Sequence, residues 1–572
     1  MMSMPAPTAR RVARVDSFFI RFLSLATRVV RAARPARLAH HALIALTVLL
    51  VLTAAHARGE DPAAPLLEDW PHWRGPLANG VAPHADPPLE WSESHNVRWK
   101  VAVPGRGTAT PIILGDRIFL LTAIETEGSS APAAGGDNAA DGSAEAASDP
   151  PRGGRSREGA GERSRDGAGN RPRDGAGERS RDGAGDRSRE GAGDRPREGA
   201  GDRPRRPGRP PGGAGEGAAG GRGAGGAGGR PGGGSSRAYE FVVLAIDRRT
   251  GRTLWQQVAR EEVPHEGHHR DHGYASASPT TDGRYLYASF GSRGVYCYDL
   301  DGQLQWEQHL GQMQTRNSFG EGASPAIYGD ALVVPWDHEG PSFLAVLDAR
   351  TGAVRWKVER DESTQWATPL VIEHEGRVQV ITNGTNRVRS YDLATGELLW
   401  ECGGQTASAI PSPVAREGVV YCMSGFRGKA IYAIPLSASG DVTHGDAILW
   451  RSDRGTPYVP SPLLYGDLLY FFDGNRAVLS VVDAPTGNVL VDRQRVPRME
   501  NVYASPVGAA DRVYLVARDG TTVVLAHGGE LEVLATNALD DPIDASPAAV
   551  GRELFLRGEK YLYCLSEESG GS

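Results

Sequence analysis

The chain has 572 residues, and 63 lysines and arginines stand against 70 aspartates and glutamates, giving a formal net charge of −7. This mild acidity gives no reason to expect a polyanionic partner, so the composition argues against nucleic-acid binding. The length exceeds that of one average domain, but two segments of biased composition are set aside before domains are counted.

The first of these segments is the N-terminus, residues 1–57. It opens with an arginine-rich leader, continues with the apolar run "ALIALTVLLVL" at 42–52, and ends with Ala55 and Ala57 in the A-x-A arrangement of a signal-peptidase site. The run is shorter than the ~20 residues that span a bilayer comfortably, which favours a cleaved signal over a permanent anchor. We expect an exported protein that meets the membrane only if this segment stays uncleaved, with an N-terminal extension at 58–95.

The second segment covers residues 127–236 and is rich in Gly, Ala, Arg and acidic residues. From Arg155 onward an octapeptide such as "RSREGAGE" recurs. The octapeptides carry no large apolar side chain, so burial cannot offset the conformational entropy that ordering would cost. The positive charges of the arginines nearly balance the negative charges of the acidic residues, which removes the electrostatic attraction to nucleic acid. No aromatic residue is interleaved to stack on bases. We predict a disordered insertion, with an adhesive or RNA-binding segment as the alternative.

A Ser/Thr-Pro step recurs along the rest of the chain. From Pro279 onward the prolines lie 46, 44, 44, 49, 44 and 41 residues apart, and the larger first gap shrinks to 58 once residues 127–236 are removed. Periods of this length are typical of propellers and solenoids. They divide residues 96–126 and 237–566 into eight units, whose prolines are Pro111, Pro279, Pro325, Pro369, Pro413, Pro462, Pro506 and Pro547.

Each unit predicts four short strands. A short apolar strand follows the Ser/Thr-Pro step, then comes a turn such as "GDRI" at 115–118 and a second strand. The third strand ends in an aspartate and a tight turn, as in "AVLDARTG" at 345–352. Period-2 patterning between Gly and Asp turns indicates antiparallel sheets, and sustained helical periodicity is missing. We predict an all-β, eight-bladed β-propeller. The fourth strand closes on a tryptophan in five units: Trp255, Trp306, Trp356, Trp400 and Trp450.

The two ends of the repeat region predict how the ring closes. The last unit stops after its third strand, "KYLYCLSEES" at 560–569, whereas an orphan strand, "NVRWKVAVP" at 96–104, precedes the first Thr-Pro step. We predict that this N-terminal strand completes the last blade, because closure removes exposed sheet edges. The insertion at 127–236 then falls between the second and third strands of blade 1, where a long excursion is tolerated, and residues 567–572 form a tail.

The chain has four cysteines: Cys297, Cys402, Cys422 and Cys564. They are scattered, without a C-x-x-C pair, which argues against a structural zinc site. In an exported protein Cys402 and Cys422 could form a disulfide, but we expect buried free thiols in strands.

Three motifs resemble the PQQ-like propeller repeat proteins, exported bacterial proteins often labelled BamB-like. They are "WPHWRGPLANGV" at 70–81, "NVRWKVAVPGRGTATPIILGDRIFLLTA" at 96–123, and the recurring Asp-x-x-Thr-Gly turn followed by tryptophan. The resemblance implies the propeller fold, a place in the periplasm or cell envelope of a bacterium, and other envelope proteins as partners. It also implies that Trp356 docks between sheets and that Asp348, Thr351 and Gly352 hold an outer hairpin.

Two departures limit what the resemblance implies. The quinoprotein dehydrogenases of this superfamily carry adjacent cysteines at their cofactor, and this sequence has no Cys-Cys pair. The assembly-machinery lipoprotein has a lipid-modified cysteine directly after its signal, and none lies near Ala57. We therefore expect no cofactor, with PQQ and calcium as the alternative.

The loops that lead into the innermost strands predict a shared site. Because a propeller is circular, the residues just before each Ser/Thr-Pro step should meet around one mouth of the central channel. They form a mixed aromatic, basic and acidic set of the kind found at ligand- or peptide-binding faces, with ordinary loop residues as the alternative. The candidates are Arg106, His272, Tyr274, Glu321, Trp366, Tyr458, Tyr503 and Asp544, with Ser408 at the equivalent place in the fifth repeat.

The segment "HEGHHRDHGYASASP" at 265–279 is the one histidine-rich stretch. Its histidines, His265, His268, His269 and His272, are irregularly spaced on a predicted loop, without the fixed geometry of a strand or helix pair. We expect polar lining of the channel mouth and no metal, with a partial transition-metal site as the alternative.

The sequence has no G-x-S-x-G elbow. Its one H-E-x-x-H match, "HEGHH" at 265–269, lies on a predicted loop and not on the helix that this zinc motif requires, so hydrolase chemistry has no support. The leading hypothesis is an exported, non-catalytic, monomeric propeller for protein–protein interaction, including envelope or outer-membrane protein assembly. The alternatives are a small-ligand- or metal-binding propeller and a PQQ-dependent quinoprotein.

Overall fold

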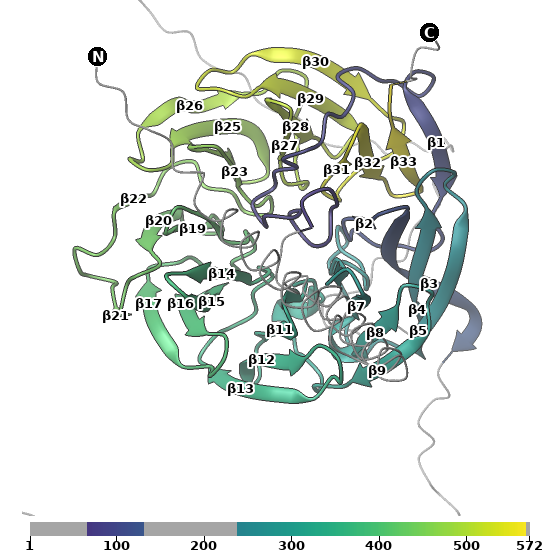
Figure 1. The fold of residues 1–572 in the computed structure, drawn as a ribbon, viewed down its shortest axis with the longest axis horizontal. Coiled ribbons are helices and arrows are strands. Elements are labelled where there is room, and N and C mark those ends of the chain that lie inside the picture. Colours follow the sequence, from purple (N-terminus) through teal and green to yellow (C-terminus); the bar gives the residue numbers. More distant parts are fainter. Residues whose placement is uncertain (1–65, 131–236, 568–572) are drawn as a thin grey trace, which may run out of the picture. The chain divides into compact units, whose positions relative to one another are not determined.

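The computed structural model describes residues 66–130 and 237–567, apart from the side chains of 127–130. These residues form eight sheets arranged in a ring, which confirms the predicted eight-bladed propeller (Figure 1). Helical structure within them is limited to two single turns, η1 (Gly291–Arg293) and η2 (Arg316–Ser318), and no helix there is long and apolar enough to cross a membrane. The predicted signal segment at 1–57, most of the insertion at 127–236 and most of the tail lie outside the described residues.

The first four blades follow one another around the ring, each with its strands in sequence order from the inside outward. Blade 1 holds β2 (Ile112–Leu114), β3 (Arg117–Ser130), β4 (Arg237–Asp247) and β5 (Thr253–Glu262); blade 2 holds β6 (Thr280–Thr281), β7 (Tyr285–Ser289), β8 (Val295–Asp299) and β9 (Leu304–Gln308); blade 3 holds β10 (Ala326–Tyr328), β11 (Ala331–Trp336), β12 (Ser342–Asp348) and β13 (Val354–Arg360); blade 4 holds β14 (Leu370–His374), β15 (Arg377–Asn383), β16 (Arg387–Asp392) and β17 (Leu398–Gly403).

The remaining four blades complete the ring. Blade 5 holds β18 (Val414–Arg416), β19 (Val419–Ser424), β20 (Ala430–Pro435) and β22 (Trp450–Ser452); blade 6 holds β23 (Leu463–Tyr465), β24 (Leu468–Asp473), β25 (Arg476–Asp483) and β26 (Val489–Arg495); blade 7 holds β27 (Val507–Ala509), β28 (Arg512–Val516), β29 (Thr521–Ala526) and β30 (Val533–Ala538); blade 8 holds β31 (Ala548–Val550), β32 (Glu553–Arg557), β33 (Tyr561–Leu565) and β1 (Val97–Ala102).

Burial differs between the middle and outer strands of a blade. In blade 3 every residue of β11 is buried, whereas in β13 residues 355–359 alternate between exposed and partly buried and only Arg360 is buried. The middle strands pack against neighbouring blades on both faces, so they need continuous apolar sequence, while an outer strand faces solvent on one side. This difference in burial explains why apolar and polar residues alternate in the sequences of the outer strands but not in those of the middle strands.

Tryptophans on the outer strands join five of the eight blades to the next. Trp356 Nε1 donates a hydrogen bond to the carbonyl oxygen of Leu393 at 2.8 Å, and its indole lies against Gly396. Gly396 has φ +77°, and an added Cβ would come within 3.0 Å of the ring, so the turn needs glycine for both conformation and space. The same bond runs from Trp99 to Arg248, Trp255 to Leu300, Trp306 to Ala349 and Trp450 to Ala484.

Trp400 departs from this pattern. It is fully buried, but its Nε1 has no hydrogen-bond partner. Blade 5 lacks the Asp-x-x-Thr-Gly turn and instead carries a longer loop with β21 (Gly440–Asp441), which pairs in parallel with β17. Blade 4 therefore has a fifth, short strand, because the loop from blade 5 covers its outer edge.

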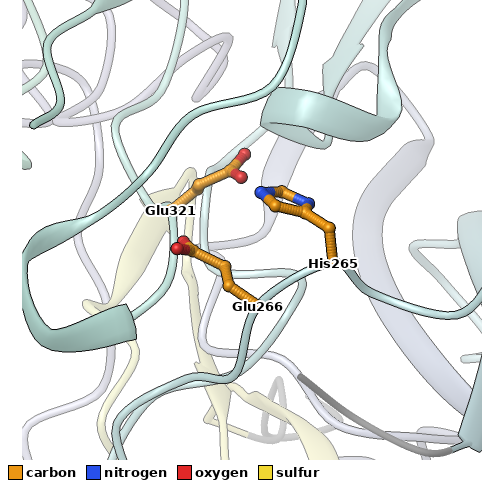
Figure 2. A group of neighbouring side chains, drawn as sticks. All are labelled: His265, Glu266 and Glu321. Atoms are coloured by element: carbon orange, nitrogen blue, oxygen red, sulfur yellow. The ribbon is translucent and has the colours of Figure 1, made fainter. Parts of the chain in front are cut away.

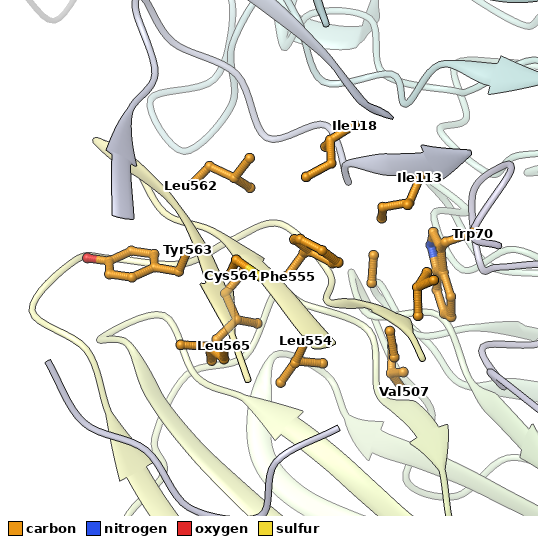
Figure 3. Packing of buried hydrophobic residues seen from close by; sticks show 14 of the residues in the cluster. Trp70, Ile113, Ile118, Val507, Leu554, Phe555, Leu562, Tyr563, Cys564 and Leu565 are labelled. Carbon is orange, nitrogen blue, oxygen red and sulfur yellow. The ribbon is translucent and has the colours of Figure 1, made fainter. Parts of the chain in front are cut away.

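The N-terminal strand closes the ring as predicted. β1 pairs antiparallel with β33, with Lys100 opposite Tyr563, and the two lie side by side although they come from opposite ends of the described chain (Figure 1). A buried cluster that includes Trp70, Phe555 and Leu565 fills the seam around blades 7, 8 and 1 (Figure 3). Closure thus combines a backbone ladder with apolar packing. The four cysteines, as expected, lie buried in strands, and they are free.

The described part of the N-terminal extension crosses the inner strands. Trp70 exchanges two backbone hydrogen bonds with Ile113 of blade 1, at 3.0 and 2.9 Å. Further along, the N–H of Ala82 donates to the carbonyl of Gly508 in blade 7 at 2.9 Å. The extension therefore ties together blades on both sides of the closure seam.

Candidate functional site

In seven of the eight Ser/Thr-Pro steps, the backbone N–H of the serine or threonine donates to the hydroxyl of the corresponding residue in the next blade. The N–H of Ser278 donates to Ser324 Oγ at 2.9 Å, and the N–H of Ser324 donates to Thr368 Oγ1 at 3.1 Å. Five further bonds of 2.9–3.1 Å repeat this link, from Thr110 to Ser278, Thr368 to Ser412, Ser412 to Ser461, Ser461 to Ser505 and Ser505 to Ser546. We call these eight residues the hydroxyl belt.

The hydroxyl belt has one gap, at the closure seam. Thr110 Oγ1 is buried and has no hydrogen-bond partner. Beside it, Arg557 Nη1 donates to the carbonyl oxygens of Ala109 and Leu121, at 3.2 and 2.8 Å. The buried guanidinium therefore replaces the missing link between blades 8 and 1 with bonds to backbone carbonyls.

A cavity of about 550 Å³, here called the belt cavity, lies inside this ring. Every belt residue except Thr110 lines it, together with aromatic side chains from several blades. Trp73 of the N-terminal extension lines it too, and its Nε1 donates to Ser412 Oγ at 3.0 Å. Because Trp73 also lines a second cavity of about 520 Å³ bordered by the extension, its indole stands between the two. The other aromatic residues of the belt cavity are Phe319, Trp366, Phe426, Tyr458 and Tyr503.

The structure brings together most of the side chains that the sequence placed at the channel mouth. Arg106 stands next to the belt cavity, where its Nη2 donates to the carbonyl of Arg270 at 2.8 Å. Tyr274 and Glu321 instead border a separate space of about 30 Å³ beside blades 2 and 3. Ser408 is buried with φ +59° and is not among the residues that line the belt cavity. The candidates that line the cavity are His272, Trp366, Tyr458, Tyr503 and Asp544.

An ion cluster forms one wall of the belt cavity. Arg518 donates two hydrogen bonds to Asp544, from Nε to Oδ1 at 2.7 Å and from Nη2 to Oδ2 at 3.0 Å. Its Nη2 also lies 3.3 Å from Asp271 Oδ1. The hydroxyl of Tyr503 donates to Asp271 Oδ2 at 3.2 Å. Burial raises the pKa of Asp544 despite Arg518, whereas at Asp271 the effect of burial is outweighed by Arg518 and Tyr503, which lower the pKa.

His272 lies next to a serine in the same wall. Its Nδ1 is 2.7 Å from Ser276 Oγ, which also accepts a hydrogen bond from the Thr108 hydroxyl at 3.0 Å. Burial lowers the pKa of His272 to about 4, so the ring is neutral near pH 7. The pair has the distance of a nucleophile and its base, but so weak a base takes up a serine proton poorly at neutral pH.

A second cluster holds the one group of histidine and carboxylate side chains, among the described residues, that is close enough to share an ion. His265, Glu266 and Glu321 have ligand atoms within 4.8 Å of one another, and the three side chains lie beside one another (Figure 2). Both oxygens of Glu266 accept hydrogen bonds from Thr315, at 2.6 and 3.0 Å, and Arg293 Nη1 donates to Glu321 at 2.9 Å. A cation there would compete with these donors, above all with the buried guanidinium.

The other histidines of the 265–279 segment contact separate partners. His268 packs edge-on against Tyr274, with ring centroids 4.6 Å apart, and His269 packs against Phe319 at 4.9 Å. Burial lowers the pKa of His268. In the described residues, the four histidines therefore do not converge on one point.

Several cavity residues were outside the sequence prediction. Trp73 belongs to the motif at 70–81, which was used only for its resemblance, and Phe319 and Phe426 carried no local signal. The same holds for Arg518, which does not line the cavity but binds its two aspartates. The belt serines were visible as the Ser/Thr-Pro repeat. That repeat identified the blades but did not reveal that its hydroxyls line a cavity.

Comparisons with known proteins agree with this architecture. The sequence profile of the family described as outer membrane protein assembly factor BamB matches residues 239–401 and 340–572, more than half of the chain. No curated protein matches the sequence.

Two solved structures are similar to this chain. BamB from Moraxella catarrhalis is 14% identical over 57% of this chain and 93% of its own, with a TM-score of 0.40. Quinohemoprotein alcohol dehydrogenase from Comamonas testosteroni is 10% identical over 91% of this chain and 84% of its own, with a TM-score of 0.50. Given the extent of the profile match and the eight repeated blades, the chain belongs to the BamB-like family of PQQ-type β-propeller repeat proteins.

Proposed function

We propose that this chain is an exported, non-catalytic propeller that acts as a scaffold for other proteins at the bacterial cell envelope. The observation that carries the proposal is the match to the family described as outer membrane protein assembly factor BamB, which covers residues 239–572. The rigid connection of the blades supports it, because a scaffold needs fixed surfaces more than moving parts.

The chemistry of the belt cavity supports a non-catalytic role. His272, with a pKa lowered to about 4 by burial, is a weak base toward Ser276. A calcium-bound quinone would need carboxylate oxygens free to bind the metal. Asp271 and Asp544, the carboxylates that line the cavity among the described residues, are both engaged by Arg518, so this donor set does not fit such a centre.

The rim of the propeller supports binding to proteins. Large apolar side chains are exposed at similar positions on the outer strands of neighbouring blades: Leu304 is 50% exposed, Val354 43% and Leu398 44%. A single exposed apolar residue is ordinary, but a repeated set offers a contact surface that a partner could cover.

Cross-linking in cell envelopes tests the scaffold role. The tagged chain should capture one or more envelope proteins, and changing Leu304, Val354 and Leu398 together to serine should weaken capture. A control with serine at Glu307, Lys357 and Glu397, which are exposed polar positions of the same blades, should capture as the unmodified chain does. Both variants should keep the wild-type melting temperature. Finding no captured protein beyond that of a tag-only control would contradict the proposal.

Export is tested separately. Fractionation should place the protein in the envelope or periplasm, and mass spectrometry of its N-terminus should find a chain beginning at Arg58, directly after Ala57. A cytoplasmic protein that retains residues 1–57 would contradict this part of the proposal.

A further inference from the structure

The wall of the belt cavity has a surplus of hydrogen-bond donors. Ser461 Oγ accepts the N–H of Ser412, and Ser505 Oγ accepts the N–H of Ser461, both at 2.9 Å. None of the belt hydroxyls that line the cavity donates to an acceptor among the described residues. Each O–H group is therefore free to donate a hydrogen bond to a molecule inside the cavity. These side chains are more than nine-tenths buried; Ser461 and Ser505 are each 2% exposed. A buried donor without an acceptor is costly, so the wall favours a ligand that brings acceptor atoms.

The strong acceptors in the same wall are already engaged. Arg518 holds both oxygens of Asp544, and Arg518 and Tyr503 hold those of Asp271. The ligand therefore has to be an acceptor for the hydroxyls rather than a donor to the carboxylates.

The charge around the belt cavity favours a monoanion. Arg270, Asp271 and Asp544 line the cavity, while Arg106 and Arg518 stand behind its wall and bond to these lining residues. Counted together, the five groups leave one positive charge in excess. One carboxylate would balance that charge, whereas a dianion would enter a partly buried site with charge left over. Hydrogen bonds to an ionised acceptor are also stronger than those to a neutral one.

Aromatic rings supply the other half of the site. Phe426 and Tyr458 stack with centroids 4.8 Å apart, and Trp73 and Trp366 line the same cavity. Its volume of about 550 Å³ falls within the ~300–1,000 Å³ usual for small-molecule sites.

We propose that the belt cavity binds a small organic monocarboxylate with an apolar body. The carboxylate accepts hydrogen bonds from the hydroxyl belt, and the apolar body lies against the aromatic rings. No metal takes part in this recognition. The activity is additional to the scaffold role and does not depend on it.

Calorimetric titration with phenylacetate and phenylacetamide, in buffer containing a chelator, tests the proposal. The two probes have the same apolar body and differ in charge. Phenylacetate should bind, and phenylacetamide should bind at least about tenfold more weakly, because a hydrogen bond to a charged group is worth more than one to a neutral group. Equal binding of both probes, or no heat from either, would overturn the proposal.

A matched pair of variants locates the binding. Thr368→Val removes a hydroxyl that lines the cavity, and Thr110→Val removes the belt hydroxyl that does not. Thr368→Val should weaken phenylacetate binding about tenfold and leave phenylacetamide nearly unchanged. Thr110→Val should change neither. Phenylacetate affinity that is unchanged in Thr368→Val would overturn the proposal.

A third variant covers the case in which Thr368→Val folds poorly, since Thr368 Oγ1 also accepts the N–H of Ser324. Phe426→Ala leaves the hydroxyl belt intact and removes part of the aromatic wall. It should weaken both probes by a similar factor, and melting curves should show all three variants folded at the titration temperature. Phenylacetate affinity that survives Phe426→Ala unchanged would place the ligand elsewhere.

Discussion

The indole of Trp356 in blade 3 lies directly over Gly396 of blade 4, and its Nε1 donates to the Leu393 carbonyl of the same turn at 2.8 Å. The contact joins an outer strand to the neighbouring hairpin. Because it recurs at five of the blade junctions in the described chain, it is the structural basis of the repeat.

Gly396→Ala should therefore destabilise the protein by about 2–4 kcal/mol in chemical unfolding, since the new Cβ forces the indole to move. Gly376→Ala is the matched control: Gly376 has a similar φ of +79°, but nothing lies within 4 Å of its added Cβ. The free energy of unfolding of that variant should fall by only roughly 1–2 kcal/mol, the cost of placing alanine in a left-handed backbone conformation. Equal losses in the two variants would show that the indole contact contributes little.

Arg74 holds the N-terminal extension to two blades. Its Nη1 donates to the carbonyl of Pro506 at 2.8 Å and its Nη2 to that of Pro462 at 2.9 Å, and the side chain is 1% exposed. Arg74→Ala should lower the free energy of unfolding by about 3 kcal/mol, because two buried carbonyls lose their donor. Arg552→Ala, at an exposed ion pair with Glu567, should change it by less than about 0.5 kcal/mol. If chemical denaturation gave the two variants the same free energy of unfolding within experimental error, this role of Arg74 would be contradicted.

The buried histidine of the belt cavity makes stability depend on pH. The pKa of His272 is about 4 in the folded protein, against an ordinary value of 6.5. Below pH 6.5 the unfolded chain therefore binds a proton at this residue, whereas the folded chain does not until the pH approaches 4. Stability from this group is thus lost as pH falls from about 6.5 to about 4, by about 3 kcal/mol.

His272→Gln should remove that loss, so its unfolding free energy should fall about 3 kcal/mol less than that of the unmodified chain between pH 7 and pH 4. His444→Gln changes an exposed histidine and should follow the unmodified chain. Parallel pH profiles for all three proteins would show that burial of His272 carries no such penalty.

The ion cluster has the opposite pH dependence once its cation is removed. In Arg518→Ala, only the more distant Arg106 still opposes the rise in the pKa of Asp544 that burial causes, so the folded chain keeps a proton to higher pH than the unfolded chain does. Its stability then falls as pH rises, and the loss relative to the unmodified chain should be about 2–4 kcal/mol at pH 8 and smaller at pH 4.

Arg454→Ala, at the exposed pair with Asp492, should show no such trend. Urea unfolding at the two pH values measures both variants. A loss in Arg518→Ala that does not change with pH would mean that Asp544 does not titrate as burial requires.

The sequence by itself determined the architecture. The Ser/Thr-Pro step, the Asp-x-x-Thr-Gly turn and the closing tryptophan are local patterns, and each specifies a strand or turn within a few residues. Their repetition predicted eight blades, and the orphan strand at 96–104 predicted the closure that β1 and β33 make. Trp400 is a case in which the pattern was present but its acceptor turn was not, so the structure leaves its indole N–H unpaired.

The tertiary structure alone decided which side chains share the belt cavity. Tyr503 bonds to Asp271 across 232 residues of sequence, and Arg518 joins both acids only because the ring brings distant loops together. Their position just before a Ser/Thr-Pro step suggested that Tyr274 and Glu321 would face the same cavity as His272. The loops differ in length and packing, so those two side chains border a separate space instead. Spacing along the chain specifies local strands, whereas the direction of a loop side chain depends on neighbours that only the closed ring supplies.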